Sequence, residues 1–341
     1  MKRWLFFLGV IVSAVFLWWA LQGLDLQHVW QSIGSANYWW LLPGIVAYFL
    51  AVWARTWRWD YMLRPLKSIP VSRLFPVVVI GYMGNNIYPF RVGEVLRAYV
   101  LRQRESVSMS ASLATVVVER VFDGLVMLVF VFAALPLAPI PNEAIRSIVV
   151  FASVAFFVAL VVFFALAAMP ARFMALAEWI SGHLLPEKLA RPLLTFLHKF
   201  LNGLHSLRSF RNVLMIFFTS VVIWLLETVK YWFVMHAFNF EVSFFALMLM
   251  NGIVNLATTL PSAPGYVGTF DGPGIAVLVL YGVENATATA YTLVLHAALW
   301  LPVTLLGAVY MIREGLTWSI FRQAAVAGNE RGAGEQAVHK L

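Results

Sequence analysis

Residues 74–97 read LFPVVVIGYMGNNIYPFRVGEVLR, an apolar segment interrupted in its middle. Glycine, asparagine and proline at this density break helices. Irregular backbone at membrane depth survives only inside protein or beside a wet cavity. A second apolar stretch, residues 244–260, is interrupted in the same way and resumes as a short apolar piece at residues 273–283. The breaks fall at Gly81, Gly84, Asn85, Asn86 and Pro89, and at Pro261, Pro264, Gly265, Gly268 and Gly272.

The composition around these breaks is that of a membrane protein. Of 341 residues, 62% are hydrophobic and 12% are charged, whereas a soluble domain has about a quarter charged residues. The chain has no cysteine, which excludes disulfides, thiolate catalysis and cysteine metal sites. The net charge of +8 indicates basic cytoplasmic loops beside anionic headgroups rather than a nucleic-acid partner.

Six stretches have the roughly 20 apolar residues that a spanning helix needs. They are residues 4–21, 38–57, 111–135, 148–169, 213–238 and 288–312. The first follows a charged start and resembles a signal peptide, but without a convincing cleavage site we interpret it as a retained helix. The predicted fold class is an all-α polytopic membrane protein with about six full transmembrane helices plus two broken-helix hairpins.

The positive charges predict the orientation. With the N-terminus inside, the loop at residues 22–37 lies outside and has no Lys or Arg. Residues 91–104 stay inside only if the first broken segment enters and turns back. The second, flanked by Glu241 and Glu284, must then be a hairpin from the outer face. Of the 24 basic residues, Arg120 and Lys230 lie within spans and Arg146 lies outside. The other 21 are at or near the inner side. The protein is therefore expected in the cell membrane, with both termini on the cytoplasmic side.

The order of the segments predicts an inverted repeat. Repeat A covers about residues 38–135 and repeat B about residues 213–312, with mirrored topology inside a single transmembrane domain, residues 1–312. Pro89-x-x-Val92-Gly93 and Pro264-x-x-Val267-Gly268 echo each other at the breaks. Paired interrupted segments indicate a transporter site near the midplane; the alternative is two ordinary loops. Residues 171–211 read as inner-face amphipathic helices, and residues 313–341 as a cytoplasmic tail, partly disordered.

The motifs at these breaks resemble a known family. They are Asn85-Asn86 through Pro89-Phe90-Arg91-Val92-Gly93-Glu94-Val95-Leu96-Arg97-Ala98, then residues 114–123 (ATVVVERVFD) and residues 261–270 (PSAPGYVGTF). Together they resemble the lysylphosphatidylglycerol synthase transmembrane-region family, flippase-like integral membrane proteins, over about residues 1–320. In fused members this region precedes a soluble aminoacyltransferase domain and moves the aminoacylated lipid. Residues 313–341 are too short for that domain, so the resemblance implies lipid translocation and not synthesis. Stand-alone relatives have been linked to isoprenoid-type lipids, which leaves the lipid class open.

Ionisable residues within the spans mark function or an obligatory partner. Glu119, Arg120 and Asp123 share one helix near mid-membrane. Two carboxylates face one guanidinium there, so one positive charge is missing. The missing partner is Arg91, Arg97, a proton or substrate, and a purely structural salt bridge is the alternative.

Arg91, Glu94 and Arg97 recur every three residues, so on a short helix they form one polar stripe. We expect Arg91 and Arg97 to bind a lipid phosphate while Glu94 orients one of them; the alternative is a basic loop at the membrane surface. Gly93 could open a half-helix whose N–H groups add to an anion site.

The second half offers weaker candidates. Glu227 and Lys230, at i,i+3, predict a structural ion pair. Asn251 and Asn255 share a face and bond freed backbone groups or contact a headgroup. Asp271 has a possible coupling role for protons or ions, whereas His236 and His296 are interpreted as packed or interfacial. The candidate substrate-binding residues are Arg91, Glu94, Arg97, Glu119, Arg120, Asp123, Asn85, Asn86, Asn251, Asn255, Thr269 and Asp271.

These features favour a lipid transporter or flippase that is not an enzyme and uses no cofactor or metal. Its substrate would be an anionic or aminoacylated phospholipid, or a polyprenyl-phosphate-type lipid. The chain has no P-loop, so a gradient or passive movement would replace ATP. The alternatives are a non-transporting scaffold for a separate lipid-modifying enzyme, and an embedded lipid-modifying enzyme. The expected partners are a membrane phospholipid or isoprenoid lipid, with a possible homo-oligomer and no nucleic acid.

Overall fold

A computed structural model describes most of the predicted repeat region. The described residues are 10–16, 24–88, 91–134, 169–184, 209–260 and 262–316, with single positions and pairs between them. Within these ranges the secondary structure is helical and no residue lies in a strand. The expected spans at residues 4–21 and 148–169 lie largely outside the described residues, as do most of residues 171–211 and the tail beyond residue 316.

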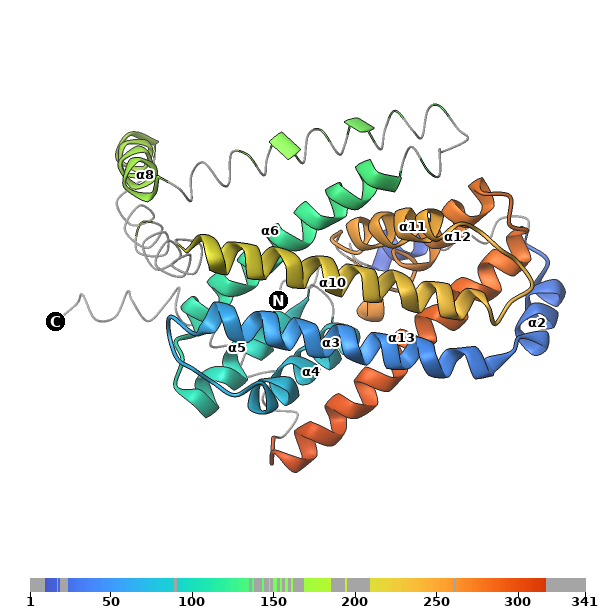
Figure 1. Ribbon diagram of the computed structural model, residues 1–341, viewed down its shortest axis with the longest axis horizontal. Helices are drawn as coiled ribbons and strands as arrows, with labels where there is room; N and C mark the ends of the chain where they lie inside the picture. The colour runs from blue at the N-terminus through green and yellow to red at the C-terminus, as the bar shows by residue number, and fades with distance from the viewer. Residues whose placement is uncertain are drawn as a thin grey trace.

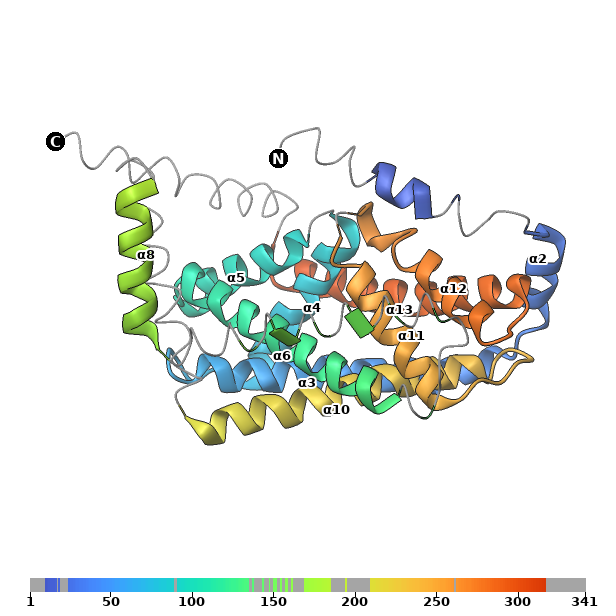
Figure 2. The ribbon, with the colours of Figure 1, turned by 90° about the horizontal axis from the view of Figure 1, so that it is seen from above.

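Four long helices form the body of the molecule: α3 (Leu41–Leu63), α6 (Met109–Ala134), α10 (Phe210–Met235) and α13 (Asn285–Arg313). Helices α3 and α10 lie side by side along the long axis (Figures 1 and 2). Residues 211–235 and 285–313 are long and apolar enough to cross a bilayer, and residues 26–63 would form a third such span bent by 71°. The count of six spans is therefore a prediction that the described helices support only in part.

Helix α3 extends past the predicted end at residue 57. It reaches Leu63 because its charged residues are not at a surface: Arg58 and Asp60 are 1% and 5% exposed. The predicted span ended at residue 57, directly before Arg58. The helix continues past that point, since charges paired inside a protein do not end a membrane helix.

Two helical hairpins sit between the long helices. The first joins α4 (Val71–Ile87) to α5 (Val92–Glu105), with Arg91 in the left-handed region at φ 52°. The second joins α11 (Phe244–Ala257) to α12 (Asp271–Leu280) through the short helix η3 (Pro264–Tyr266). Each predicted segment therefore contains a helix interruption. The positions differ in part, because α4 continues through Gly81, Gly84, Asn85 and Asn86, and Gly272 lies inside α12.

The tips of the two hairpins meet inside the molecule. An Nη2–H of Arg91 donates to the carbonyl of Thr258 at 3.3 Å. A Cβ placed on Gly265 would lie 3.3 Å from the carbonyl oxygen of Asn86. Residues 167 and 179 positions apart in the sequence thus form one contact region at the centre of the helical body.

The two ends of the helical body differ in charge. At one end Lys67 and Arg73 lie 2.8 and 3.7 Å from Glu105 carboxylate oxygens, and Arg104 pairs with Glu314. The end that carries the starts of α11 and α13 has Glu241 and Glu284 and no Lys or Arg in residues 236–287. Helices α8 (Pro170–Leu184) and α2 (Leu26–Ser35) lie across opposite ends (Figure 2), and η1 (Tyr38–Trp40) joins α2 to α3.

Candidate functional site

A cavity of about 130 Å³ lies where the two hairpin tips meet. Its walls come from α3, α4, α6, α10, α11, α13, η3 and the residue before α5. The space is large enough for several water molecules or a small polar group. Its charged lining consists of four cations and one carboxylate: Arg55, Arg91, Arg120, Lys230 and Glu227. With His296, which also lines the cavity, counted as neutral, the lining has a formal charge of +3.

Arg91 and Arg120 face each other across Glu94. The Oε1 of Glu94 lies 3.2 Å from Nε of Arg120 and 3.7 Å from Nη1 of Arg91. Both arginine side chains keep accessible surface, 25% exposed for Arg91 and 38% for Arg120. The Nε of Arg91 has no hydrogen-bond partner among the described residues. One carboxylate thus divides its charge between two cations that retain donors for an anion.

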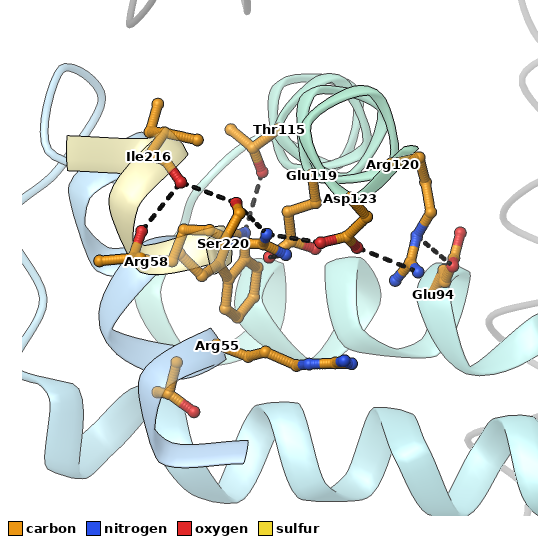
Figure 3. A network of polar contacts seen from close by, with 12 residues as sticks. Arg55, Arg58, Glu94, Thr115, Glu119, Arg120, Asp123, Ile216 and Ser220 are labelled. Atoms are coloured by element: carbon orange, nitrogen blue, oxygen red, sulfur yellow. Dashed lines mark hydrogen bonds and ion pairs between the residues drawn. The ribbon is translucent and has the colours of Figure 1, made fainter. Parts of the chain in front are cut away.

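Behind the cavity wall, a buried row of ion pairs connects three helices. Nη1 of Arg58, on α3, lies 2.6 Å from Oδ1 of Asp123 on α6 and donates to Oγ of Ser220 on α10 at 2.6 Å. Asp123 also accepts from Nε1 of Trp224 at 3.1 Å, and its Oδ2 lies 3.5 Å from Nη1 of Arg120. Figure 3 shows this row running from Arg58 through Asp123 and Arg120 to Glu94.

Glu119 anchors a second branch of this network. Its Oε2 accepts from Nη2 of Arg97 at 2.5 Å, and its Oε1 lies 3.9 Å from Arg58. The Arg97 guanidinium lies over the ring of Trp59 at 4.3 Å. Glu119 is 1% exposed, so only these cations offset its burial. Arg97 on α5 is thus bonded to Glu119 on α6.

A third set of charges lies on α10. The predicted ion pair between Glu227 and Lys230 is present. It is extended by Arg55 on α3, whose Nη2 lies 3.0 Å from Oε1 of Glu227. Nη1 of Arg55 also donates to the Tyr82 hydroxyl at 2.6 Å. This pair therefore also ties α3 and α4 to α10 and lines the cavity.

The second hairpin carries no arginine or lysine. Asn255 donates from Nδ2 to the side-chain and backbone oxygens of Asn251, both at 2.8 Å. Asn251 donates to Oγ1 of Thr228 at 3.3 Å, and Thr269 donates to the carbonyl of Tyr266 at 3.1 Å. These amides and the hydroxyl bind backbone and neighbouring helices, which was the first of the two roles considered for the asparagines.

The structure divides the predicted site residues into two groups. The cavity is lined by Asn85, Asn86, Arg91, Arg120 and Asn255, together with the predicted ion pair. Arg97 is absent from this lining. It bonds Glu119, as one of the alternatives considered for that carboxylate expected, and does not join Arg91 at the cavity. The other candidates that do not line the cavity are Glu94, Glu119, Asp123, Asn251, Thr269 and Asp271.

Three charged or titratable groups at this site were not predicted as site residues. Arg55 and Arg58 are i,i+3 on α3; Arg58 supplies the positive charge that Asp123 lacked, and Arg55 pairs with Glu227. Arg55 lies inside the apolar stretch 38–57, so an inventory of every charge within a span would have found it. His296 also lines the cavity, and its partners come from a distant hairpin that sequence spacing does not reveal.

The whole network has an excess of positive charge. It contains six cations and four carboxylates, which gives a formal charge of +2: Arg55, Arg58, Arg91, Arg97, Arg120 and Lys230 against Glu94, Glu119, Asp123 and Glu227. Uncompensated charge is costly away from water. An anion in the cavity would offset this excess.

Comparisons with known proteins agree with this architecture. Residues 6–307 match the model of the family described as lysylphosphatidylglycerol synthase TM region. A UPF0104 membrane protein of Methanothermobacter thermautotrophicus is 27% identical over 77% of this chain and 82% of its own. A UPF0104 membrane protein of Pyrococcus horikoshii is 23% identical over 92% of this chain and 98% of its own. Glycosyltransferase AglD of Haloferax volcanii is 29% identical over 106 residues, which are 29% of this chain and 16% of that protein.

The family match explains why the motifs and the helical hairpins occur together. The matched residues include both hairpins and all four long helices except the last residues of α13. The chain therefore belongs to the lysylphosphatidylglycerol synthase transmembrane-region family and is a multi-pass membrane protein.

Proposed function

We propose that this protein moves an anionic lipid between the leaflets of the membrane. The observation that carries the proposal is the cavity between the hairpin tips, with four cations and one carboxylate in its lining. Arginine donates paired hydrogen bonds to phosphate oxygens, and Arg91 and Arg120 retain accessible donors there. The headgroup would enter this cavity while the acyl or prenyl chains stay in the surrounding bilayer.

The charge of the lining favours some lipids over others. A phosphodiester or phosphomonoester headgroup lowers the formal charge of the cavity, whereas an aminoacyl group adds an ammonium beside Lys230 and Arg55. Like charges in a low-dielectric site repel strongly. We therefore propose an anionic phospholipid or a polyprenyl-phosphate-type lipid in preference to an aminoacylated one.

The proposed membrane topology places the cavity near the midplane. Helices α3, α6, α10 and α13 would span the bilayer, residues 4–21 and 148–169 would complete six spans, and the hairpins would be re-entrant. Repeats A and B would then have opposite orientations, as transporters with inverted repeats do. The cation-rich end of the helical body supports a cytoplasmic position for that end and for both termini.

A second candidate function is a scaffold for a separate lipid-modifying enzyme. One observation favours it: the matched 106 residues form only 16% of a longer protein named a glycosyltransferase. That relation associates this type of membrane segment with an enzyme in one chain. An embedded enzyme within this chain has no comparable support, because the cavity lining is a set of fixed cations rather than a nucleophile with a base.

Reconstitution into liposomes tests the leading proposal. Purified protein would be mixed with labelled phosphatidylglycerol, aminoacyl-phosphatidylglycerol or polyprenyl phosphate, and accessibility of each label would be followed across the bilayer. We expect protein-dependent movement of an anionic lipid, and loss of that movement in Arg120→Gln.

The matched control is Arg73→Gln, which removes an arginine whose side chain is 70% exposed. It should move lipid at the normal rate. If the aminoacylated lipid moved faster than the anionic lipids, the proposed selectivity would be overturned. If a folded protein moved none of the lipids, the scaffold would become the better reading.

A further inference from the structure

His296 holds two hydrogen-bond acceptors, one at each ring nitrogen. Nδ1 lies 2.7 Å from Oδ1 of Asp271, and Nε2 lies 2.7 Å from the carbonyl oxygen of Gly265. The ring of Phe270 lies 4.5 Å from the imidazole. Asp271 is 2% exposed, and its Oδ2 accepts from the N–H of Gly268 at 2.9 Å. The His296–Asp271 pair is therefore enclosed except where the imidazole reaches the cavity.

These contacts require more protons than a neutral histidine supplies. A neutral imidazole has one N–H and can satisfy one acceptor. Two acceptors at 2.7 Å require an N–H at both nitrogens, which is the imidazolium form. Imidazole is a much stronger base than a carboxylate, and Oδ2 of Asp271 already accepts a hydrogen bond from Gly268. The structure thus places the proton on His296 and the negative charge on Asp271.

No other charge compensates Asp271 within the described part of the chain. The cations on the cavity walls already have carboxylate partners: Arg55 and Lys230 pair with Glu227, and Arg91 and Arg120 with Glu94. The other titratable groups that line the cavity are Tyr48, Tyr82, Tyr231 and Tyr266. A buried carboxylate needs a cation, and at Asp271 that cation is protonated His296.

The same face of α13 also holds the first hairpin. Trp300 and Thr304 follow His296 at i+4 and i+8, so all three share one side of the helix. Nε1 of Trp300 donates to the carbonyl of Asn86 at 3.2 Å, and Nδ2 of Asn86 donates to Oγ1 of Thr304 at 2.8 Å. One helix face thus fixes both hairpin tips, and only the His296 contacts depend on a proton.

We propose that the His296–Asp271 pair is a proton-binding site that couples proton movement to the cavity between the hairpin tips. With the proton bound, His296 holds Gly265 and Asp271 against α13 and the tips stay joined. On release, the proton leaves for water in the cavity, and a neutral imidazole and a carboxylate remain. The neutral imidazole has a single N–H and can bond only one of its two acceptors. When the bond to the carbonyl of Gly265 is lost, the residues around Gly265 are freed from α13. The coupling to lipid rests on the proposed function, whereas the proton site does not.

Nitrogen NMR of ¹⁵N-histidine-labelled protein in nanodiscs tests the proton site directly. At about pH 7.5, where a solvated histidine is mainly neutral, we expect one imidazolium signal. It should disappear in His296→Gln and become neutral in Asp271→Asn. His28, which lies 3.4 Å from Asp25 on an exposed surface, is the matched histidine–aspartate pair, and His28→Gln should leave the imidazolium signal unchanged. Only neutral signals in the wild-type protein would overturn the proposal.

Lipid movement under a pH gradient tests the coupling. In proteoliposomes we expect the wild-type rate to change several-fold when the gradient is reversed, and the His296→Gln rate to be insensitive to it. His28→Gln should keep the wild-type response. A gradient-independent wild-type rate would overturn the coupling even if the imidazolium is seen. Absence of any lipid movement beside a clear imidazolium signal would instead contradict the proposed function and leave the proton site standing.

Discussion

The two hairpins present different kinds of polar group to the same cavity. The first hairpin brings Arg91, and behind it Glu94 and Arg97, into a network of guanidinium–carboxylate pairs. The second brings backbone carbonyls, amides and one aspartate whose partner is His296. Arginine keeps its charge at any ordinary pH, whereas histidine changes charge near neutrality. One half of the site is therefore built from fixed charge and the other from a charge that can be removed.

The hairpins also differ in how their arms are packed. A Cβ on Gly93 would lie 1.8 Å from the carbonyl oxygen of Gly81 and 2.6 Å from the backbone nitrogen of Asn85. The equivalent atom on Gly274, in the second hairpin, would meet the flexible end of Met250 at 2.9 Å and Thr292 at 3.0 Å. The first hairpin is thus joined backbone to backbone, and the second through side chains.

The largest expected effect is the loss of Arg58, which tests the fixed-charge half. Arg58→Met leaves Asp123 without its closest cation at a site where Arg58 is 1% exposed. Removing one partner of a buried ion pair costs about 3–5 kcal/mol. We expect a large drop in the thermal unfolding midpoint in detergent, whereas Asn255→Ala, which removes a neutral amide of the second hairpin that bonds Asn251, should lower it far less.

A double variant separates charge from packing in that experiment. In Arg58→Met with Asp123→Asn, the unpaired carboxylate is gone and Glu119 keeps Arg97, so part of the stability should return. Equal losses for Arg58→Met and Asn255→Ala would contradict the idea that the first half is held by a structural charge network.

The second prediction compares the two hairpin tips in headgroup binding. A hydrogen bond to a charged group contributes about 1.5–3 kcal/mol, so Arg91→Gln should weaken binding of the anionic lipid roughly 10- to 150-fold. Asn255→Ala, at the second tip, removes a neutral group and should weaken it about 2- to 10-fold. The measurement is the lipid concentration that gives half-maximal transport, and a larger effect at Asn255 would reverse the comparison.

The sequence predicted the interruptions that define the fold. Proline, glycine and asparagine act locally, so an interruption in each segment could be predicted without a structure, although α4 continues through Gly81, Gly84, Asn85 and Asn86. The sequence could not show that the tips meet, because the contact between Arg91 and Thr258 depends on how the helices pack. The continuation of α3 past residue 57 was not predicted either, since Arg58 is typical of a surface until its partners on α6 and α10 are known.

The candidate site was predicted in the same uneven way. Glu119 and Asp123 were identified because charges within an apolar span are conspicuous, and their shortage of positive charge was correctly inferred. The residue that pairs with Asp123 came from α3, and Arg97 was found on Glu119 rather than beside Arg91. His296 was interpreted as a packed residue because its partners lie 25 and 31 positions away, beyond the spacing that a single helix reveals.

The third prediction tests the packing difference between the hairpins. Alanine favours a helix over glycine by about 1 kcal/mol, yet Gly93→Ala places a methyl group onto backbone that cannot move aside. We expect a net loss of about 1–3 kcal/mol in unfolding free energy, together with a weakened contact between α4 and α5. Gly274→Ala should be nearly neutral, because the thioether of Met250 can turn away. A neutral Gly93→Ala would show that the first hairpin is not rigid.

The smallest expected effect comes from a single hydrogen bond at the first tip. Thr304→Val keeps the shape of the side chain but removes the acceptor for Nδ2 of Asn86. Hydrogen bonds between membrane helices contribute about 0.6 kcal/mol on average and at most about 1.7 kcal/mol. Thr292 is the control on the same helix, because its hydroxyl donates to the carbonyl of Ala288 within α13 at 2.7 Å.

Thermal unfolding of the two valine variants gives the comparison. Thr304→Val should lower the midpoint slightly at every pH, and Thr292→Val should leave it unchanged. Because Asn86 and Thr304 do not titrate, the first tip has no means of responding to protons through this bond. A pH-dependent effect of Thr304→Val would mean that proton release at His296 also loosens the first hairpin, and that the two tips move together rather than one against a fixed partner.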